Sequence, residues 1–276
     1  MSRFGVITRN GIVRSFIEGS QAIIYDPDAQ AFFTAANITN TTQKSAVNQL
    51  VLDLKSANIW TKMKALYPVV GGVASSHAVN LKQPGTFNLS FATGWTHSST
   101  GMTPNGATYA NTFFNPVTQN IGSSSAHMAY YGRTPSTTSD GAEMGNYNGV
   151  TVSGIAIQGK SSASESRYYY SYSLRAVNSV VTAPIGLVLG TSTSTASRKL
   201  IVNNIIKGVN NTTDTVAMNN FNIYIGAANL NNTTVGSYVN CQLAFSSIGD
   251  GLTDAEATNF YNAVQNYQTT LNRQVP

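Results

Sequence analysis

Charged residues are scarce in this sequence. Asp, Glu, Lys and Arg make up 10% of its 276 residues, against roughly 25% in ordinary soluble domains. The net charge is +5, but the bases are scattered and their densest cluster is the pair Arg198–Lys199. A nucleic-acid-binding protein gathers its bases on one face, so nucleic acid is not expected as a partner. Uncharged polar residues must cover the surface, as in β proteins found outside cells or in assemblies.

Cysteine and long apolar runs are also lacking. Cys241 is the single cysteine, which excludes an intramolecular disulfide and a Cys-based zinc site, and we expect it to be buried in a strand. No apolar run approaches the ~18 residues of a membrane-spanning helix, and the first residues lack the apolar core of a Sec-type signal peptide. Membrane insertion is therefore not expected.

Paired carboxylates, the mark of many hydrolases, are missing as well. A glycosidase needs two carboxyl groups facing each other at ~5–10 Å, and Asp140 and Glu143 are the one near pair in the β region. We interpret them as solvated loop charges. His77, His97 and His127 lack the spacing of metal ligands, and His127 is expected to face outward from its strand. No nucleophile elbow or phosphate loop is present, so we expect no metal, no cofactor and no enzyme.

The best-encoded element lies at the C-terminus. Gly249-Asp250-Gly251 signals a turn, and Thr253 with Glu256 has the spacing of a capping box. The spacing predicts an amphipathic helix over about 253–272, with Arg273 near its end, where the dipole favours a cation. Its apolar face comprises Ala257, Phe260, Val264, Tyr267 and Leu271.

The first 25 residues predict a separate β arm. Asn10-Gly11 stands between two β-like runs, the strongest short signal for a hairpin, and residues 16–25 predict a further strand. The arm is too small to form its own core, so it must pack on the main domain or on a partner. Its candidate attachment residues are Arg3, Phe4, Arg9, Arg14 and Phe16.

Residues 26–276 predict one domain. Asp26-Pro27 can cap a short helix, and a second helix follows from Thr39, giving a helical segment over about 28–63 that we expect to lie against a sheet. From residue 67 to 248, short β-like runs alternate with Ser/Thr/Asn/Gly-rich loops, which favours a two-sheet jelly roll with one buried and one wet face per sheet. The expected strands cover 87–91, 126–133, 150–158, 168–174, 185–190, 199–206, 222–227 and 243–248.

Aromatic residues are the one positive sign of a binding surface. Successive strand residues face opposite sides, so a pair such as Tyr130–Tyr131 is expected to send one ring outward. Such a ring suits a sugar or a protein interface, although packing in the core and against cross-strand neighbours is the alternative. The candidate glycan- or partner-binding residues are Trp95, His97, Tyr131, Arg133, Tyr147 and Tyr169.

Several motifs carry a resemblance to a known class of protein. W-T-K-M-K-A-L-Y-P-V-V-G-G at 60–72, G-W-T-H-S-S at 94–99 and the closing S-I-G-D-G-L-T-D-A-E-A from Ser247 resemble a module of tailed-phage structural proteins. K-L-I-V-N-N at 199–204 and N-I-Y-I-G-A at 222–227 look like paired strands of concanavalin A-like (laminin G-like) jelly rolls. The resemblance covers about 26–275.

The resemblance implies a non-enzymatic virion protein on the phage surface, such as a tail fibre or a capsid decoration, with a lectin-like domain over 26–276. It implies host-surface or glycan binding, other virion proteins as partners, a homo-oligomer, and residues 1–25 as the virion anchor. The acidic calcium-binding clusters of some lectins of this fold have no counterpart here. A polysaccharide-degrading enzyme of the particle is the alternative.

Overall fold

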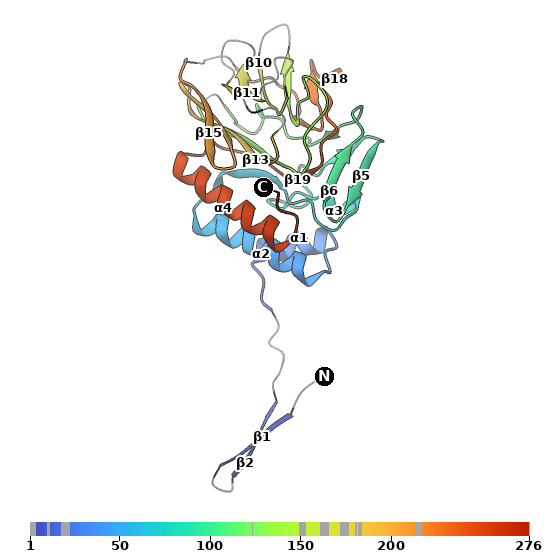
Figure 1. Ribbon diagram of the computed structural model, residues 1–276, viewed down its shortest axis with the longest axis vertical. Coiled ribbons are helices and arrows are strands. Elements are labelled where there is room, and N and C mark those ends of the chain that lie inside the picture. The colour runs from blue at the N-terminus through green and yellow to red at the C-terminus, as the bar shows by residue number, and fades with distance from the viewer. Residues whose placement is uncertain are drawn as a thin grey trace.

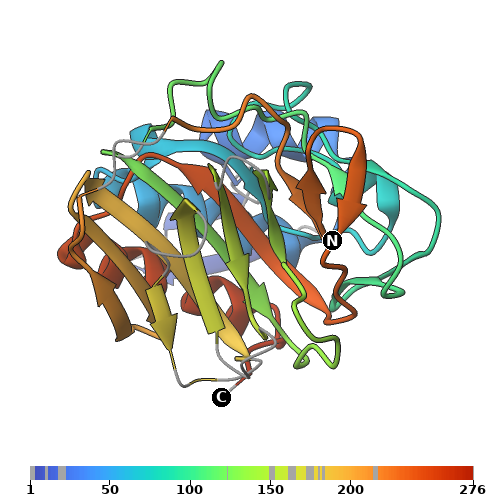
Figure 2. The ribbon, with the colours of Figure 1, turned by 90° about the horizontal axis from the view of Figure 1, so that it is seen from above.

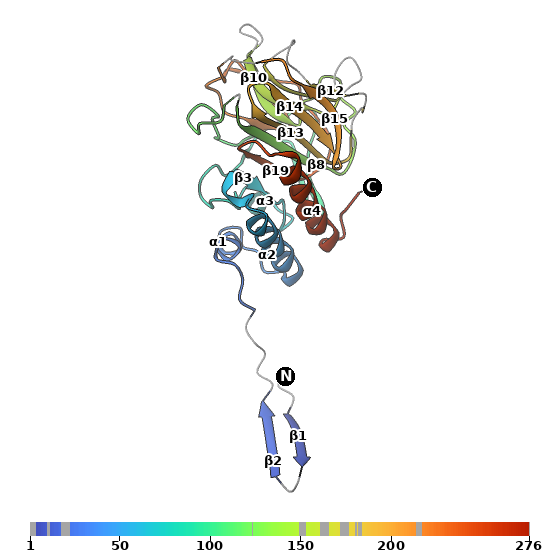
Figure 3. The ribbon, with the colours of Figure 1, turned by 90° about the vertical axis from the view of Figure 1, so that its left-hand side faces the viewer.

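The structure is a computed structural model of the chain. It describes residues 4–9, 12–17, 23–122, 124–148, 153–160, 166–171, 177–179, 181, 184–213 and 217–275, with the backbone alone for 4–9, 12–17 and 166–171. These residues form three stacked layers, with helices on one side and two sheets above them (Figures 1 and 3). The mainly β fold of two packed sheets with flanking helices that was predicted from the sequence is confirmed.

The sheet next to the helices, here called the inner sheet, has eight strands among the described residues. Seven strands follow the order β15–β14–β13–β8–β19–β6–β5. The eighth strand, β3, pairs with the C-terminal half of β19, on the same edge where β6 pairs with its first residue, Leu243. All these pairs are antiparallel. The strands are β3 (Met63–Tyr67), β5 (Trp95–Ser98), β6 (Gly101–Pro104), β8 (Ala126–Gly132), β13 (Gly186–Ser194), β14 (Ser197–Val202), β15 (Ile205–Asn210) and β19 (Leu243–Gly249).

The outer sheet lies on the far side of the inner sheet from the helices (Figure 2) and has nine described strands. Seven follow the order β12–β11–β10–β9–β16–β7–β4, β17 also pairs with β9, and β18 pairs with β17. The nine strands are β4 (Ser90–Phe91), β7 (Ala110–Asn111), β9 (Met144–Asn148), β10 (Ser153–Gln158), β11 (Ser166–Ser171), β12 (Val177–Ser179), β16 (Tyr224–Ile225), β17 (Ala228–Leu230) and β18 (Thr234–Gly236).

The helical layer confirms both predicted helical segments. α1 (Pro27–Ala35) begins at the Asp26 cap, α2 (Thr41–Ser56) begins at Asn40, and α4 (Asp254–Thr270) begins with the predicted capping box. A 3-10 turn, Trp60–Lys62, and the short α3 (Ala74–His77) complete it. At the end of the predicted helical segment, residues 63–67 form β3, which pairs with β19. α2 and α4 lie side by side under the inner sheet (Figure 3).

Two apolar clusters hold the layers together. One fills the space between the helices and the inner sheet and includes Phe32, Leu50, Phe245 and Phe260. The other fills the space between the two sheets. The inner sheet is therefore covered on both faces. The expectation that each sheet has one solvent-exposed face is wrong for the inner sheet. All seven residues of β8 are buried.

The N-terminal hairpin is confirmed at the backbone level. β1 (Phe4–Arg9) and β2 (Ile12–Ile17) pair antiparallel, with Arg9 opposite Ile12, and they lie away from the sandwich in Figures 1 and 3. Residues 23–26 are not in a strand, and the rest of the strand predicted over 16–25 lies outside the described residues or within β2. The chain joins the domain at the helical layer, where the Asp26 backbone N–H donates to Asn48 Oδ1 at 2.7 Å.

Candidate functional site

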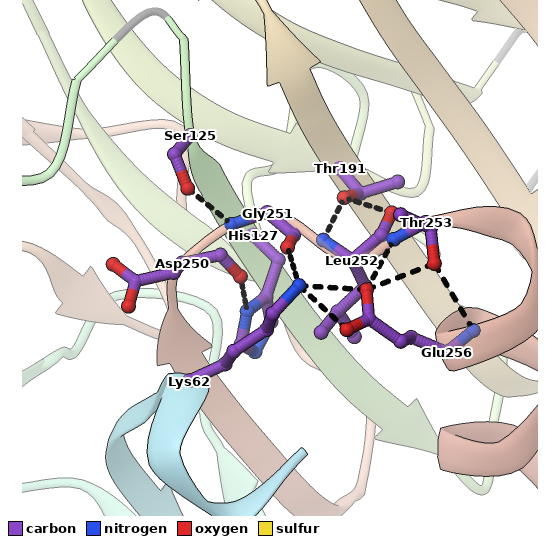
Figure 4. A network of polar contacts seen from close by, with 9 residues as sticks. All are labelled: Lys62, Ser125, His127, Thr191, Asp250, Gly251, Leu252, Thr253 and Glu256. Carbon is purple, nitrogen blue, oxygen red and sulfur yellow. Dashed lines mark hydrogen bonds and ion pairs between the residues drawn. The ribbon is translucent and has the colours of Figure 1, made fainter. Parts of the chain in front are cut away.

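The closing motif forms a network that joins α4 to the inner sheet (Figure 4). A side chain at Gly249 would collide with the Lys62 carbonyl oxygen, and one at Gly251 with the Ser192 carbonyl oxygen. Lys62 Nζ lies 2.6 Å from Glu256 Oε1, so the capping-box residue also carries an ion pair. The motif is thus explained by close packing at the start of a helix.

His127 lies at the centre of this network and is fully buried, which corrects the prediction that it faces outward. Its Nδ1 lies 2.6 Å from the Asp250 carbonyl oxygen. Since a carbonyl only accepts, Nδ1 carries the proton, and Nε2 accepts from the Ser247 hydroxyl at 3.1 Å. Burial lowers the pKa of His127 to about 4, so the ring is neutral at pH 7.

Ser247 and His127 have the contacts of a nucleophile and its base, but their environment does not suit catalysis. Both side chains are fully buried, and the Phe260 ring of α4 lies 5.9 Å from the imidazole, centroid to centroid. A substrate could reach the serine only after α4 had left the sheet. We therefore assign the pair a structural role.

Glu143 and Asp140 do not form a catalytic pair. Asp140 is exposed, whereas Glu143 is 2% exposed, so the interpretation of Glu143 as a solvated loop charge is wrong. Glu143 Oε2 accepts from the Gly159 N–H at 2.6 Å. Burial raises the pKa of the Glu143 carboxyl group to about 7. Among the described residues, no second carboxylate contacts it.

Trp95 and His97 belong to an aromatic cluster at the β5 edge. The rings of Trp95 and His97 stack at 6.4 Å, and Phe91 lies against both. His97 Nδ1 lies 2.9 Å from His77 Nδ1. Burial lowers the pKa of His97. Burial lowers the pKa of His77 to about 3, with smaller contributions from the nearby His97 and Arg273. Two neutral rings therefore share one hydrogen bond.

This cluster does not have the composition of a metal centre. Within the described part of the chain, no group of three or more His, Cys, Asp or Glu side chains could hold a metal ion. The Trp95 ring is only partly exposed and packs against the core between the sheets. A flat, open surface is therefore not formed at Trp95.

Tyr131 and Arg133 both contact the C-terminal segment. Tyr131 is fully buried, because β8 is covered on both faces: its ring faces the helices while that of Tyr130 faces the outer sheet. The Val275 N–H donates to the Tyr131 hydroxyl at 2.9 Å. Arg133 Nε donates to the Arg273 carbonyl oxygen at 2.9 Å. Both residues hold the C-terminal segment in place.

The outer sheet carries an aromatic surface that the sequence analysis missed. Ala110, Phe114 and Ile225 point into the core between the sheets, so the residues that alternate with them lie on the opposite, outer face. We call Tyr109, Asn111, Phe113 and Tyr224 the aromatic stripe.

The stripe has a regular geometry. Tyr224 is opposite Asn111 in the ladder, and its ring stacks on that of Tyr109 with centroids 4.5 Å apart and planes 16° apart. The Tyr109 and Tyr224 rings are partly exposed, and Phe113 is 52% exposed. An aromatic face in this setting offers an apolar surface with polar hydroxyl tips.

Phe113 is held in an unusual backbone conformation. Its φ is 55°, in the left-handed region, which costs a bulky residue about 1 kcal/mol or more. The Asn111 Oδ1 atom accepts from the Phe113 N–H at 2.8 Å and supports this turn. The next residue, Phe114, is fully buried. The turn thus places one phenylalanine in the core and leaves its neighbour in solvent.

Two predicted residues lie in the same sheet as the stripe. Tyr147 on β9 is partly buried, with its hydroxyl 3.2 Å from Ser237 Oγ. The ladder places Tyr169 opposite Ala156, Ala156 opposite Gly145, and Gly145 opposite Tyr224. Tyr169 therefore shares a cross-strand row with the stripe. Alternation in T-Y-A-N-T-F-F at 108–114 was the signal that could have found Tyr109 and Phe113.

The candidate anchor residues cannot be placed in a site. Phe4, Arg9, Arg14 and Phe16 lie on β1 and β2, for which the backbone alone is described, and Arg3 lies outside the described residues. No described helix has the length and apolar character needed to cross a membrane.

Comparisons with known proteins give no family. No family model matches the sequence, and no curated protein matches it. The chain has a distant structural likeness to domain 4 of AbnA, a GH43 extracellular arabinanase from Geobacillus stearothermophilus that was solved with arabinotriose. The identity is 12% and the TM-score 0.45, over 72% of this chain and 98% of that one.

Two further structures are similarly distant. The binding domain of botulinum neurotoxin serotype G is 11% identical with a TM-score of 0.44, over 72% of this chain and 50% of that one. A mutant Trypanosoma rangeli sialidase with trans-sialidase activity is 10% identical with a TM-score of 0.43, over 80% of this chain and 39% of that one.

Proposed function

We propose that this chain is a non-enzymatic protein of the bacteriophage particle surface, and that its aromatic stripe binds a glycan of the host surface. The observation that carries the proposal is the stripe itself: two partly exposed tyrosine rings and one exposed phenylalanine ring on the outer sheet, the phenylalanine in a strained conformation. Rings of this kind stack on the apolar faces of sugars. The virion setting rests on the sequence motifs.

The layer order supports a role in display. The chain enters the domain at the helical layer, where Lys55 Nζ pairs with Asp26 at 2.7 Å. The stripe lies on the outer face of the outer sheet, with the inner sheet between it and the helices. A particle that held the N-terminal arm would therefore leave the stripe facing away from the attachment point.

Glycan binding is tested with a glycan array and then with titration of the best array ligand. Phe113→Ala and Tyr224→Ala are each expected to weaken binding about two- to tenfold, because one stacking contact contributes about 0.5–1.5 kcal/mol. Leu52→Ala is the matched control, since Leu52 is an exposed apolar residue (41%) on α2, away from the stripe. Full-strength binding by both stripe variants would contradict the assignment, as would the absence of any array ligand.

Anchoring is tested separately by deleting residues 1–22. The deletion keeps the Asp26 cap, so we expect a folded domain that is no longer incorporated into particles. The measurement is the protein content of purified particles after complementation. Normal incorporation of the shortened chain would contradict the anchor role without touching the glycan proposal.

The alternative enzyme has less support. It predicts release of reducing ends from polysaccharide and loss of that release in Glu143→Gln. Hydrolysis by two carboxylates requires both to face the substrate, and Glu143 is enclosed between the sheets. Detection of such a release would replace the binding proposal.

A further inference from the structure

A buried acid lies directly beside the strand that carries Tyr224. The Glu143 carbonyl oxygen accepts from the Gly226 N–H at 2.9 Å. The next two residues of β9, Met144 and Gly145, pair with Ile225 and Tyr224. The backbone of Glu143 thus forms the end of the ladder that holds β16 in the outer sheet.

The Glu143 carboxyl group points into an enclosure with few partners. Besides the Gly159 N–H, Oε1 lies 3.9 Å from the Cys241 thiol sulfur. The absence of a side chain at Gly159 makes room for the acid, because a Cβ atom there would lie 2.5 Å from Glu143 Oε1 and 2.9 Å from the Tyr130 hydroxyl oxygen. The Tyr130 hydroxyl has no hydrogen-bond partner among the described residues.

No described cation compensates a charge at this position. Among the described residues, the ionisable groups that face Glu143 are the Tyr130 phenol from β8 and the Cys241 thiol from the segment before β19, and burial raises the pKa of both. Directly after β10 and β16 the neighbours are Gly159 and Gly226, which have no side chains. Lys160 Nζ lies 3.5 Å from the Thr137 carbonyl oxygen instead.

We propose that the proton on the Glu143 carboxyl group regulates the aromatic stripe. With the proton bound, the enclosure is neutral and β16 stays paired with β9. When the proton leaves, a carboxylate remains between the sheets without a counter-ion, and hydration of that charge requires the β9–β16 junction to open. The Tyr109–Tyr224 stack then loosens, and the stripe loses its geometry.

The structural part of this inference is independent of any ligand, whereas its consequence for binding rests on the proposed function. The direction follows from burial, which disfavours the charged form of a carboxyl group. The ordered stripe is thus the acidic-to-neutral form, and the loosened stripe is the alkaline form.

The first experiment titrates Glu143 itself. The chain has four glutamates, so ¹³C labelling of their carboxyl carbons gives few NMR signals, and Glu143→Gln assigns one of them. We expect the Glu143 signal to titrate near neutrality. Titration in the ordinary acidic range would overturn the proposal. If Glu143→Gln does not fold, assignment of the remaining three glutamates identifies the fourth signal in the wild-type protein.

The second experiment follows the stripe through ¹⁹F-labelled tyrosine and amide exchange of residues 224–226. Between pH 5.5 and 8.5 we expect the Tyr224 signal of the wild-type protein to shift, and exchange at pH 8.5 to be at least tenfold faster than in Glu143→Gln. Asp140→Asn is the control, because it removes an exposed carboxylate three residues away and Asn tolerates its φ of 54°.

Equal exchange in the wild-type protein and Glu143→Gln would overturn the regulation. A working switch in a protein that binds no glycan would remove only the proposed function. Glycan binding that is independent of pH, with a shifting Tyr224 signal, would show that the stripe changes without affecting the binding of the glycan and would also overturn the regulatory role.

Discussion

The two sheets use their aromatic residues differently. In the inner sheet, Tyr130 and Tyr131 are adjacent and both are buried, since one ring contacts the outer sheet and the other the helical layer. In the outer sheet, Phe113 and Phe114 are also adjacent, but only Phe114 is buried. The difference shows that the alternation of side chains along a strand places adjacent rings on opposite faces of the sheet. The neighbouring layers decide whether each face is exposed to solvent.

The largest effect is expected at the seam between α4 and the inner sheet. Arg273 is buried, and its guanidinium group donates to the Pro68, Val69 and Ala244 carbonyl oxygens at 2.7–2.8 Å. Val69 has a φ of 52°, a strained conformation for a β-branched residue that this contact supports. Arg273→Ala should lower the free energy of unfolding by about 4 kcal/mol, since it leaves buried carbonyls unpaired.

The measurement is urea unfolding at pH 7. Arg133→Ala is the matched control, because Arg133 is partly exposed and its loss should cost about 1 kcal/mol. Equal effects of the two substitutions would mean that the buried contacts of Arg273 do not hold the seam.

Phe114→Ala is expected to have an effect of comparable size. It removes a fully buried ring that packs beside Phe87, and such truncations cost about 3–5 kcal/mol. Urea unfolding again measures the loss. A cost below about 1 kcal/mol would show that the core between the sheets is less tightly packed than its burial indicates.

Acid should destabilise the covered side of the inner sheet. The pKa of His127 is about 4 in the fold and 6.5 ordinarily. Its contribution is therefore fully present above pH 6.5 and is lost as the pH falls through 4, for a total of about 3 kcal/mol. Unfolding followed from pH 7 to pH 4 should show this slope, to which His77 also contributes because its pKa is lowered to about 3, and His127→Gln should reduce it by the His127 share. His97→Gln, at a partly exposed site, should leave most of the slope, and a slope unchanged by His127→Gln would contradict the assignment.

Alkali should destabilise the space between the sheets. The pKa of Glu143 is about 7 in the fold and 4.5 ordinarily. Its contribution is present below pH 4.5 and is lost as the pH rises through 7, for a total of up to about 3 kcal/mol. Glu143→Gln should remove this dependence and be more stable than the wild-type protein at pH 8. Thermal unfolding at pH 5 and pH 8 measures both, and a less stable variant at pH 8 would contradict the account.

The smallest effect on stability is expected at Phe113. Because its ring is half in solvent and its φ is positive, Phe113→Asn should stabilise the fold by about 0.5 kcal/mol, since Asn adopts this conformation more readily. The same variant should bind glycan more weakly than the wild-type protein. A loss of stability similar to that of Phe114→Ala would remove the contrast between the two sheets.

Much of the fold followed from local patterns. The Thr253–Glu256 capping box, the Asp26 cap and the Asn10-Gly11 hairpin each act over a few residues, and each is found in the structure at the predicted place. Strand bounds were less predictable. The expected run over 87–91 shortens to Ser90–Phe91 because Phe87 has a φ of 56°, and β5, β6 and β9 lie in loops or short runs without a clear alternation.

The candidate site was mostly not predictable. Tyr131 and His127 alternate as outward residues should, but helices distant in sequence cover that face. Glu143 stands in a polar loop sequence and is nevertheless enclosed, because Gly159 and Cys241 close around it from other segments. Tyr109 and Tyr224 are more than a hundred residues apart, so their stacking could not be found from spacing.

The sequence by itself determined that this chain is a β-sandwich with an amphipathic C-terminal helix, because caps, turns and alternation are short-range properties of the backbone and its side chains. The tertiary structure alone decided which sheet face is open, which acid is buried and which rings meet. Burial depends on the layers that cover a residue, and those layers come from parts of the chain that no local pattern connects.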